Sequence, residues 1–247
     1  YVIVIVSSLS FAGYFIIKFF GAAKGIFFVA FFGGAFSSTA VTWVFSSRSK
    51  ENEALSVHYA AGIIIACAVM LARVLVVAAL FNIAVFQWLL IPCSLMILSS
   101  AFVVYQLKRK AMSLPVASDP IQLGNPLDMG NALLFGVQYI LIILFVYYAN
   151  LYLGTKGLYI TGLLSGLADV DAINISVSKL SLTTINPSTA SVVVLLAILS
   201  NTAFKMVICY TKGSEKIRKK VLIGLLPSII TGLLSIIVLY LKSNSLL

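Results

Sequence analysis

Two carboxylates, Asp169 and Asp171, lie within the apolar stretch 157–178. An ionised side chain at membrane depth is costly unless it is paired or hydrated, so acids there are candidates for a functional site. Residues two apart on a regular helix point about 200° from one another, which would keep the two carboxylates from sharing an ion. If the chain is unwound around Gly166, an extended backbone turns both to the same side. Asp169 and Asp171 could then bind one ion or proton, and they are the candidate metal ligands.

A simpler role for Asp169 is to cap a half-helix, because Asp and Ser often cap helix N-termini. Ser37 and Ser38 would then do the same in an earlier, similar stretch. Capping accounts for one acid more readily than for two. The sequence therefore favours a solute or proton role for the pair of acids. Capping combined with internal salt bridges to Arg73 or Lys205 is the alternative.

Other polar residues at membrane depth extend this candidate site. Hydroxyl oxygens, carboxylates and carbonyl groups favour cations, whereas the N-termini of half-helices favour anions, so these motifs leave the sign of the ion open. Asn201 could line the site or hydrogen-bond between helices. Arg73 could neutralise the acids, whereas Lys205 is near enough to its helix end to reach the membrane surface. The further candidate residues for binding an ion or substrate are Ser37, Ser38, Thr39, Asn174, Asn201 and Arg73.

The sequence contains no Ser/His/Asp set, Walker loop or HExxH motif, so an enzyme is not expected. Its three cysteines lie in apolar segments without CxxC spacing, which does not suggest a disulfide framework or a zinc site. We expect no cofactor other than a bound metal cation.

The composition indicates a membrane protein. Hydrophobic residues make up 61% of the chain and charged residues 10%, and the mean hydropathy is +1.10; soluble domains carry about a quarter charged residues. The net charge of +10 comes from basic residues in short loops between apolar runs, a pattern typical of membrane topology and not of nucleic-acid binding. The runs long enough to cross a bilayer are 2–20, 57–80, 84–107, 131–150, 188–211 and 221–241.

The chain contains an internal duplication. Residues 34–42 align with residues 166–174 at an offset of 132, the difference between 34 and 166. At the same offset Arg73 falls on Lys205, and each is a lone cation in an apolar helix. We therefore divide the chain into three parts. They are a first membrane repeat at 1–107, a polar linker at 108–130 and a second membrane repeat at 131–247.

The basic loops indicate how the two copies face. If 25–46 and 157–178 cross the bilayer like the other runs, the copies are parallel, and the sides hold seven and eight basic residues. If each instead enters and leaves on one side, as two half-helices meeting at Gly33–Gly34 or Ser165–Gly166, the second copy is inverted. The sides then hold twelve and three. The positive-inside rule favours the second arrangement. We expect an all-α polytopic protein, with three transmembrane helices and one broken or re-entrant element per copy.

Several motifs resemble an uncharacterised bacterial membrane domain, the domain of unknown function 4010, found C-terminal to MgtC/SapB-type domains. They are residues 33–40, 71–73, 125–126, 166–172 and 199–201 together with Lys205. The resemblance carries no function over to individual residues. It implies an upstream MgtC-like membrane domain as a partner and, by association, magnesium physiology. Because the chain opens on an apolar run without Met, we expect a fragment.

We predict a membrane transporter or channel for a small ion in the bacterial inner membrane. Its site would lie at the broken helices near the membrane midplane, where inverted-repeat transporters bind substrate. A cation such as Mg²⁺ or H⁺ is slightly favoured. The alternative is a non-transporting regulator that binds another membrane protein through small residues such as Gly162, Ser165 and Gly166. The expected partners are the lipid bilayer and the ion, and a homo-oligomer is compatible with either function.

Overall fold

The structure is a computed structural model that describes residues 26–51, 53–111 and 156–244 together with positions 140, 141, 144, 148 and 152. No strand occurs among these residues, and nearly all of them are helical. The predicted run 2–20, most of the run 131–150 and most of the linker 108–130 lie outside the described residues.

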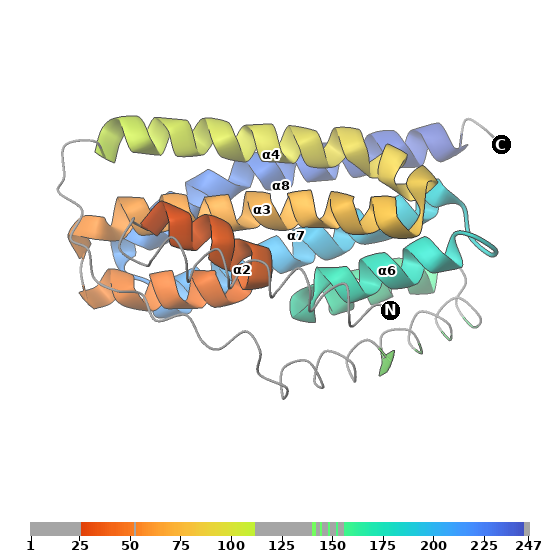
Figure 1. Ribbon diagram of the computed structural model, residues 1–247, viewed down its shortest axis with the longest axis horizontal. Coiled ribbons are helices and arrows are strands. Elements are labelled where there is room, and N and C mark those ends of the chain that lie inside the picture. The colour runs from red at the N-terminus through yellow and green to blue at the C-terminus, as the bar shows by residue number, and fades with distance from the viewer. Residues whose placement is uncertain are drawn as a thin grey trace. The chain divides into compact units, whose positions relative to one another are not determined.

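Five of the described helices are long and apolar enough to cross a membrane, judged by length and composition. The chain is therefore a multi-pass, all-helical membrane protein, as the composition predicts. Two shorter helical segments, residues 156–168 and α6, precede α7. In chain order the helices are α2 (Ile26–Glu51), the short η2 (Glu53–Leu55), α3 (Ser56–Phe81), α4 (Ile83–Ala111), α6 (Val170–Leu180), α7 (Pro187–Lys212) and α8 (Glu215–Asn244). Figure 1 labels the α-helices.

Two polar residues separate the long helices into hairpins. Asn82 stands alone between α3 and α4, where its side-chain oxygen accepts hydrogen bonds from the backbone N–H groups of Ala84 and Val85. The Ser214 hydroxyl accepts a hydrogen bond from the N–H of Ile217 at the start of α8. Asn and Ser are preferred N-cap residues because they satisfy N–H groups that the helix leaves unpaired. Asn82 and Ser214 are also 132 positions apart.

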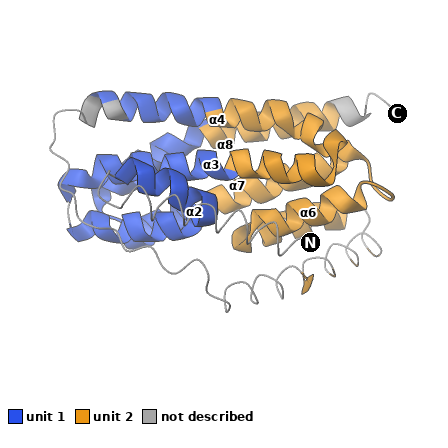
Figure 2. Cartoon of the chain, in the orientation of Figure 1, with its two compact units in different colours: residues 1–70, 98–134, 205–227 blue, residues 71–97, 135–204, 228–247 orange. Residues whose placement is uncertain are grey.

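The chain forms two compact units, shown in blue and orange in Figure 2. Unit 1 contains residues 1–70, 98–134 and 205–227, and unit 2 contains the rest. Helices α3 and α7 each contribute to both units, so each unit combines segments from both predicted repeats. The division of the chain into repeats at 1–107 and 131–247 stays a prediction.

In unit 1, α2 folds back on itself. A methyl group at Gly62 of α3 would lie 3.2 Å from Cγ2 of Ile26 and 2.5 Å from Cε2 of Phe45. Phe45 is nineteen positions after Ile26, which would place the two residues about 28 Å apart on a straight helix. Both can approach Gly62 only because the helix bends sharply at Ser37, where the backbone is not helical.

In unit 2, residues 156–180 also return to the end from which they start. Gly162 packs against Val193 of α7, and the backbone carbonyl of Ser178 accepts a hydrogen bond from Asn82. Ser191, two residues before Val193, donates a hydrogen bond to the carbonyl oxygen of Val85 at 3.4 Å. A straight helix would separate residues 162 and 178 by about 24 Å. Here both lie near the same place, where the first part of α7 meets the junction between α3 and α4.

Along much of their length, α4 and α8 expose large apolar side chains. Ile91 and Leu98 on α4 and Ile223 and Val238 on α8 are each at least 60% exposed. Large exposed apolar surfaces are rare on water-soluble proteins and normal for helices that contact lipid. The exposed faces of α4 and α8 therefore agree with a bilayer environment.

Candidate functional site

The two helix breaks lie at Ser37 and Asp169. Ser37 has φ −153° and ψ 97° within α2, and Asp169 has φ −156° and ψ 137° between helix 156–168 and α6. Both are extended conformations. The predicted breaks at Gly33–Gly34 and Ser165–Gly166 are therefore wrong by three to four residues. The observed breaks are 132 positions apart, the same as the offset between the two sequence motifs.

The glycines next to the breaks serve helix packing instead. A methyl group at Gly34 would lie 2.7 Å from the Cα of Ala66 in α3, closer than real Cβ contacts allow. A methyl group at Gly166 would collide in the same way with the backbone of Ala197 in α7. Small residues let helices approach closely inside membranes. The helix continues through each glycine and ends at the first residue that can cap the next helix.

Both break residues cap the half-helix that follows. The Ser37 hydroxyl accepts a hydrogen bond from the N–H of Ala40 at 3.1 Å. The two carboxylate oxygens of Asp169 accept hydrogen bonds from the N–H groups of Asp171 and Ala172, at 3.2 and 3.3 Å. Capping by Asp169 and Ser37, which the sequence offers as the alternative to a solute or proton role, is what the structure shows. The positive N-terminal end of the α6 dipole also stabilises the negative charge of Asp169.

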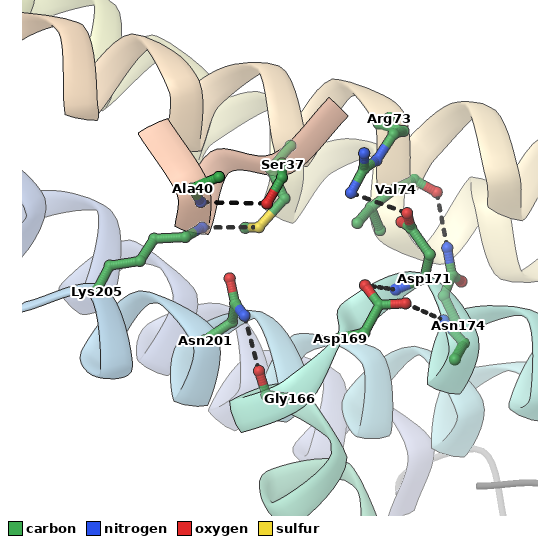
Figure 3. A network of polar contacts seen from close by, with 12 residues as sticks. Ser37, Ala40, Arg73, Val74, Gly166, Asp169, Asp171, Asn174, Asn201 and Lys205 are labelled. Atoms are coloured by element: carbon green, nitrogen blue, oxygen red, sulfur yellow. Dashed lines mark hydrogen bonds and ion pairs between the residues drawn. The ribbon is translucent and has the colours of Figure 1, made fainter. Parts of the chain in front are cut away.

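Asp171 takes a different partner from Asp169. Its Oδ2 atom lies 2.9 Å from a terminal nitrogen of Arg73 on α3, and the two side chains are only 4% and 15% exposed. Figure 3 shows the two carboxylates, with Asp171 directed toward Arg73 and Asp169 toward the backbone of α6. Removing one member of such a buried pair leaves an uncompensated charge. The ion pair between Asp171 and Arg73 therefore ties the start of α6 to the second half of α3.

Amide side chains extend this tie along the same two helices. Nδ2 of Asn174 donates a hydrogen bond to the carbonyl oxygen of Val74 at 3.0 Å (Figure 3). One turn further on, Asn82 donates to the carbonyl oxygen of Ser178 at 3.1 Å. The predicted site residue Asn174 thus holds α6 on α3 from a fully buried position. Sequence reasoning did not single out Asn82, although a lone Asn between two apolar runs is a usable signal.

Asn201 of α7 lies at the other side of the Asp169 break. Its Nδ2 donates a hydrogen bond to the carbonyl oxygen of Gly166 at 2.8 Å, which satisfies one of the last carbonyl groups of helix 156–168. Its Oδ1 atom is buried and has no hydrogen-bond partner among the described residues. Such an acceptor inside a protein calls for an explanation. Asn201 thus links two helices through its amide nitrogen, while its amide oxygen has no partner among the described residues. Both roles expected of it, a link between helices and a part of the site, are compatible with these contacts.

The Ser37 break and its neighbours belong to unit 1, whereas the other predicted site residues belong to unit 2. Ser38 is buried and its carbonyl oxygen accepts a hydrogen bond from Thr42, and Thr39 is half-buried. Whether the two breaks form one site near the membrane centre stays a prediction. The described residues contain no group of three or more His, Cys, Asp or Glu residues that could hold a metal ion.

Lys205 does not reach the membrane surface, so that expectation is wrong. Its side chain is 0% exposed, and its Nζ donates a hydrogen bond to Sδ of Met70 at 3.1 Å. The Cys67 thiol is a second hydrogen-bond partner. Two sulfur atoms one turn apart on α3 therefore hold the ammonium group inside unit 1.

These features define the class of the protein, a multi-pass helical membrane protein with polar groups at interrupted helices. Residues 4–213 match a family described as a domain of unknown function, DUF4010. The match covers most of the chain, which therefore belongs to this family, as the motifs predict. An uncharacterised protein of Aquifex aeolicus (strain VF5) is 30% identical over 197 residues, which is 76% of this chain and 83% of that protein. No solved structure matches the chain.

Proposed function

We propose that the chain is a membrane transporter or channel for a small ion, with its binding element at the Asp169 break. The observation that carries this proposal is the buried ion pair between Asp171 and Arg73 beside an interrupted helix. Charged side chains within apolar spans are expensive and usually mark ion or proton pathways. Interrupted helices are a recurrent means of placing such groups inside transporters.

The charges around the Asp169 break favour a cation. Two carboxylates and one guanidinium group lie around the break, and the positive end of α6 is already occupied by the Asp169 carboxylate. An incoming anion would therefore meet two negative groups. Oδ1 of Asn201 adds an acceptor and no positive charge. A cation would balance the excess carboxylate.

Of the two cations expected, H⁺ fits the contacts better than Mg²⁺. The guanidinium group of Arg73 is 2.9 Å from the Asp171 carboxylate, so a divalent ion would have to compete with a fixed positive charge. Mg²⁺ also demands near-ideal octahedral oxygen ligands. A proton can bind one oxygen of Asp171 and thereby release Arg73. Mg²⁺ held by Asp169 and Asp171 remains the alternative ion.

The location we propose is the bacterial inner membrane, because the inverted arrangement places most basic loops on one side. Two contacts support this arrangement. Ser214 donates its backbone N–H to Ser49 at 2.9 Å in unit 1, and Asn82 contacts Ser178 in unit 2. Each contact joins two loops that a parallel arrangement would place on opposite sides. An upstream MgtC-type domain and a homo-oligomer remain proposals.

The alternative of a non-transporting regulator has less support. It relied on a small-residue face of Gly162, Ser165 and Gly166 that would receive a partner helix. Gly162 and Gly166 already pack against Val193 and Ala197 of the same chain. That face is therefore used inside the protein.

The test is ion flux in vesicles reconstituted with the purified protein. Replacing both acids in the variant Asp169→Asn/Asp171→Asn should abolish flux, because the break then carries no carboxylate. The matched control is Glu51→Gln/Glu53→Gln, which also removes two acids but from exposed positions at the end of α2 and the start of η2. Helical content and elution volume check folding. Undiminished flux in the folded double Asn variant would refute the site, and equal loss in the control would refute its specificity.

A further inference from the structure

A pocket of about 420 Å³ lies where α7 ends and α8 begins, within unit 1. Its walls include the apolar side chains of Val207, Val221 and Leu222, and its rim carries Glu215, Arg218 and Lys219. Charged groups thus meet an apolar surface at the end of two candidate membrane spans. A phospholipid presents the same combination, a charged headgroup joined to an apolar chain.

The guanidinium group of Arg218 is held in place on this rim. Its Nε donates a hydrogen bond to the carbonyl oxygen of Gly213 at 3.0 Å, and its centre lies 5.1 Å above the ring of Tyr210. The two terminal NH₂ groups carry four further N–H donors in a planar fork. Such a fork matches two oxygens of a phosphate group. Because the side chain is already oriented, binding would cost little further ordering.

Lys219 supplies a second, more adaptable cation. It pairs with Glu215 at 2.7 Å, but both side chains are more than 70% exposed. Exposed pairs of this kind contribute little stability, so Lys219 can turn from Glu215 to a phosphate at small cost. Residues 212–220 contain five basic residues and one acid. The excess positive charge makes an anionic ligand complementary to this end of the helices.

We propose that this pocket binds an anionic phospholipid. Its phosphodiester contacts Arg218 and Lys219, and an acyl chain lies along the exposed apolar surface of Val207 and Leu222. Basic pockets between membrane helices are known to bind anionic headgroups. The apolar walls favour a lipid over free phosphate, which would gain nothing from them. The site is independent of the proposed ion-binding element.

Lipid binding to the purified full chain, measured by native mass spectrometry, tests this proposal. Phosphatidylglycerol should bind at least about tenfold more tightly than phosphatidylcholine. The variant Arg218→Gln/Lys219→Gln should lose this preference. The matched control Lys156→Gln/Lys179→Gln, which removes two cations of unit 2, should keep it. Lys219→Gln alone, at an exposed side chain, should weaken phosphatidylglycerol binding severalfold and covers the case in which the double variant does not fold.

Three results would overturn the proposal. Equal binding of the two lipids by the natural chain would remove the charge preference. An unchanged preference in the folded Arg218→Gln/Lys219→Gln variant, or in Lys219→Gln, would place the headgroup elsewhere. Competition by millimolar inorganic phosphate as strong as that by the lipid would identify a free anion as the ligand, which contradicts a role for the apolar walls.

Discussion

At the scale of single residues, Asp169 and Asp171 differ in what they contact although one residue separates them. Asp169 caps α6 through backbone N–H groups, and Asp171 pairs with Arg73. The extended backbone at Asp169 makes this division possible, because it ends one helix and begins another within a single residue. One carboxylate therefore organises the break, while the other fixes the break to α3.

The pairing of Arg73 with Asp171 gives a prediction for stability. Arg73→Gln should lower the free energy of unfolding by about 3–5 kcal/mol, because it leaves a buried carboxylate uncompensated. Arg73→Gln/Asp171→Asn should recover much of that loss, since both charges are then gone. Unfolding in detergent of Arg73→Gln, Asp171→Asn and the double variant measures the coupling energy between the two side chains. Strictly additive losses would show that the two side chains do not depend on each other.

At the scale of elements, both interrupted helices use the same construction. A glycine lets the first half-helix pack tightly, a cap residue three positions later breaks the chain, and the second half-helix returns to the starting end. The pairs Gly34 with Ala66 and Gly166 with Ala197 occupy corresponding places. This correspondence supports the predicted duplication through contacts that the sequence alignment did not use.

Tight packing at these glycines gives a second prediction. Gly34→Ala and Gly166→Ala should each lower the free energy of unfolding by about 1–3 kcal/mol, because the added methyl group meets backbone atoms of the neighbouring helix. Gly33→Ala is the matched control, since it changes the adjacent residue of the same helix. Thermal unfolding in detergent compares the three variants. A stabilising effect at Gly34 and Gly166 would contradict the close approach.

The element scale also shows where sequence reasoning reached its limit. Hydropathy identified α3, α4, α7 and α8 because long apolar runs have few structural alternatives. The sequence favours breaks at Gly33–Gly34 and Ser165–Gly166, because glycine disfavours helices in isolation. In the folded protein this preference is outweighed by helix packing, since only glycine lets α2 approach Ala66 of α3 and lets helix 156–168 approach Ala197 of α7. The burial of Lys205 is likewise not predictable from its own helix, because its sulfur partners lie on α3, far away in the sequence.

At the scale of the whole molecule, each repeat is predicted to cross the membrane three times with opposite orientation. The structure describes the two compact units separately, and each contains a folded-back element. The contacts of Ser214 with Ser49 and of Asn82 with Ser178 are local. In each contact the two loops meet, which is the placement that the inverted arrangement predicts.

Side-specific labelling tests this topology. Single cysteines replace Lys50, Lys156 or Lys216 in a chain whose natural cysteines are changed to alanine, and a maleimide that cannot cross membranes labels right-side-out and inverted vesicles. The inverted arrangement predicts that positions 50 and 216 react from one side and position 156 from the other. A parallel arrangement would instead place 216 with 156. Labelling of 216 and 156 from the same side would therefore contradict our topology.

The most direct test of the proposed function is proton flux through vesicles containing the Asp169→Ser variant. Serine caps helices about as well as aspartate, and Ser37 already does so at the corresponding break, so this variant should keep the stability of the natural chain. It removes one of the two carboxylates that balance the cation, so its flux should fall at least tenfold. A stable Asp169→Ser protein with the full flux of the natural chain would show that Asp169 is only a cap, and would contradict the account.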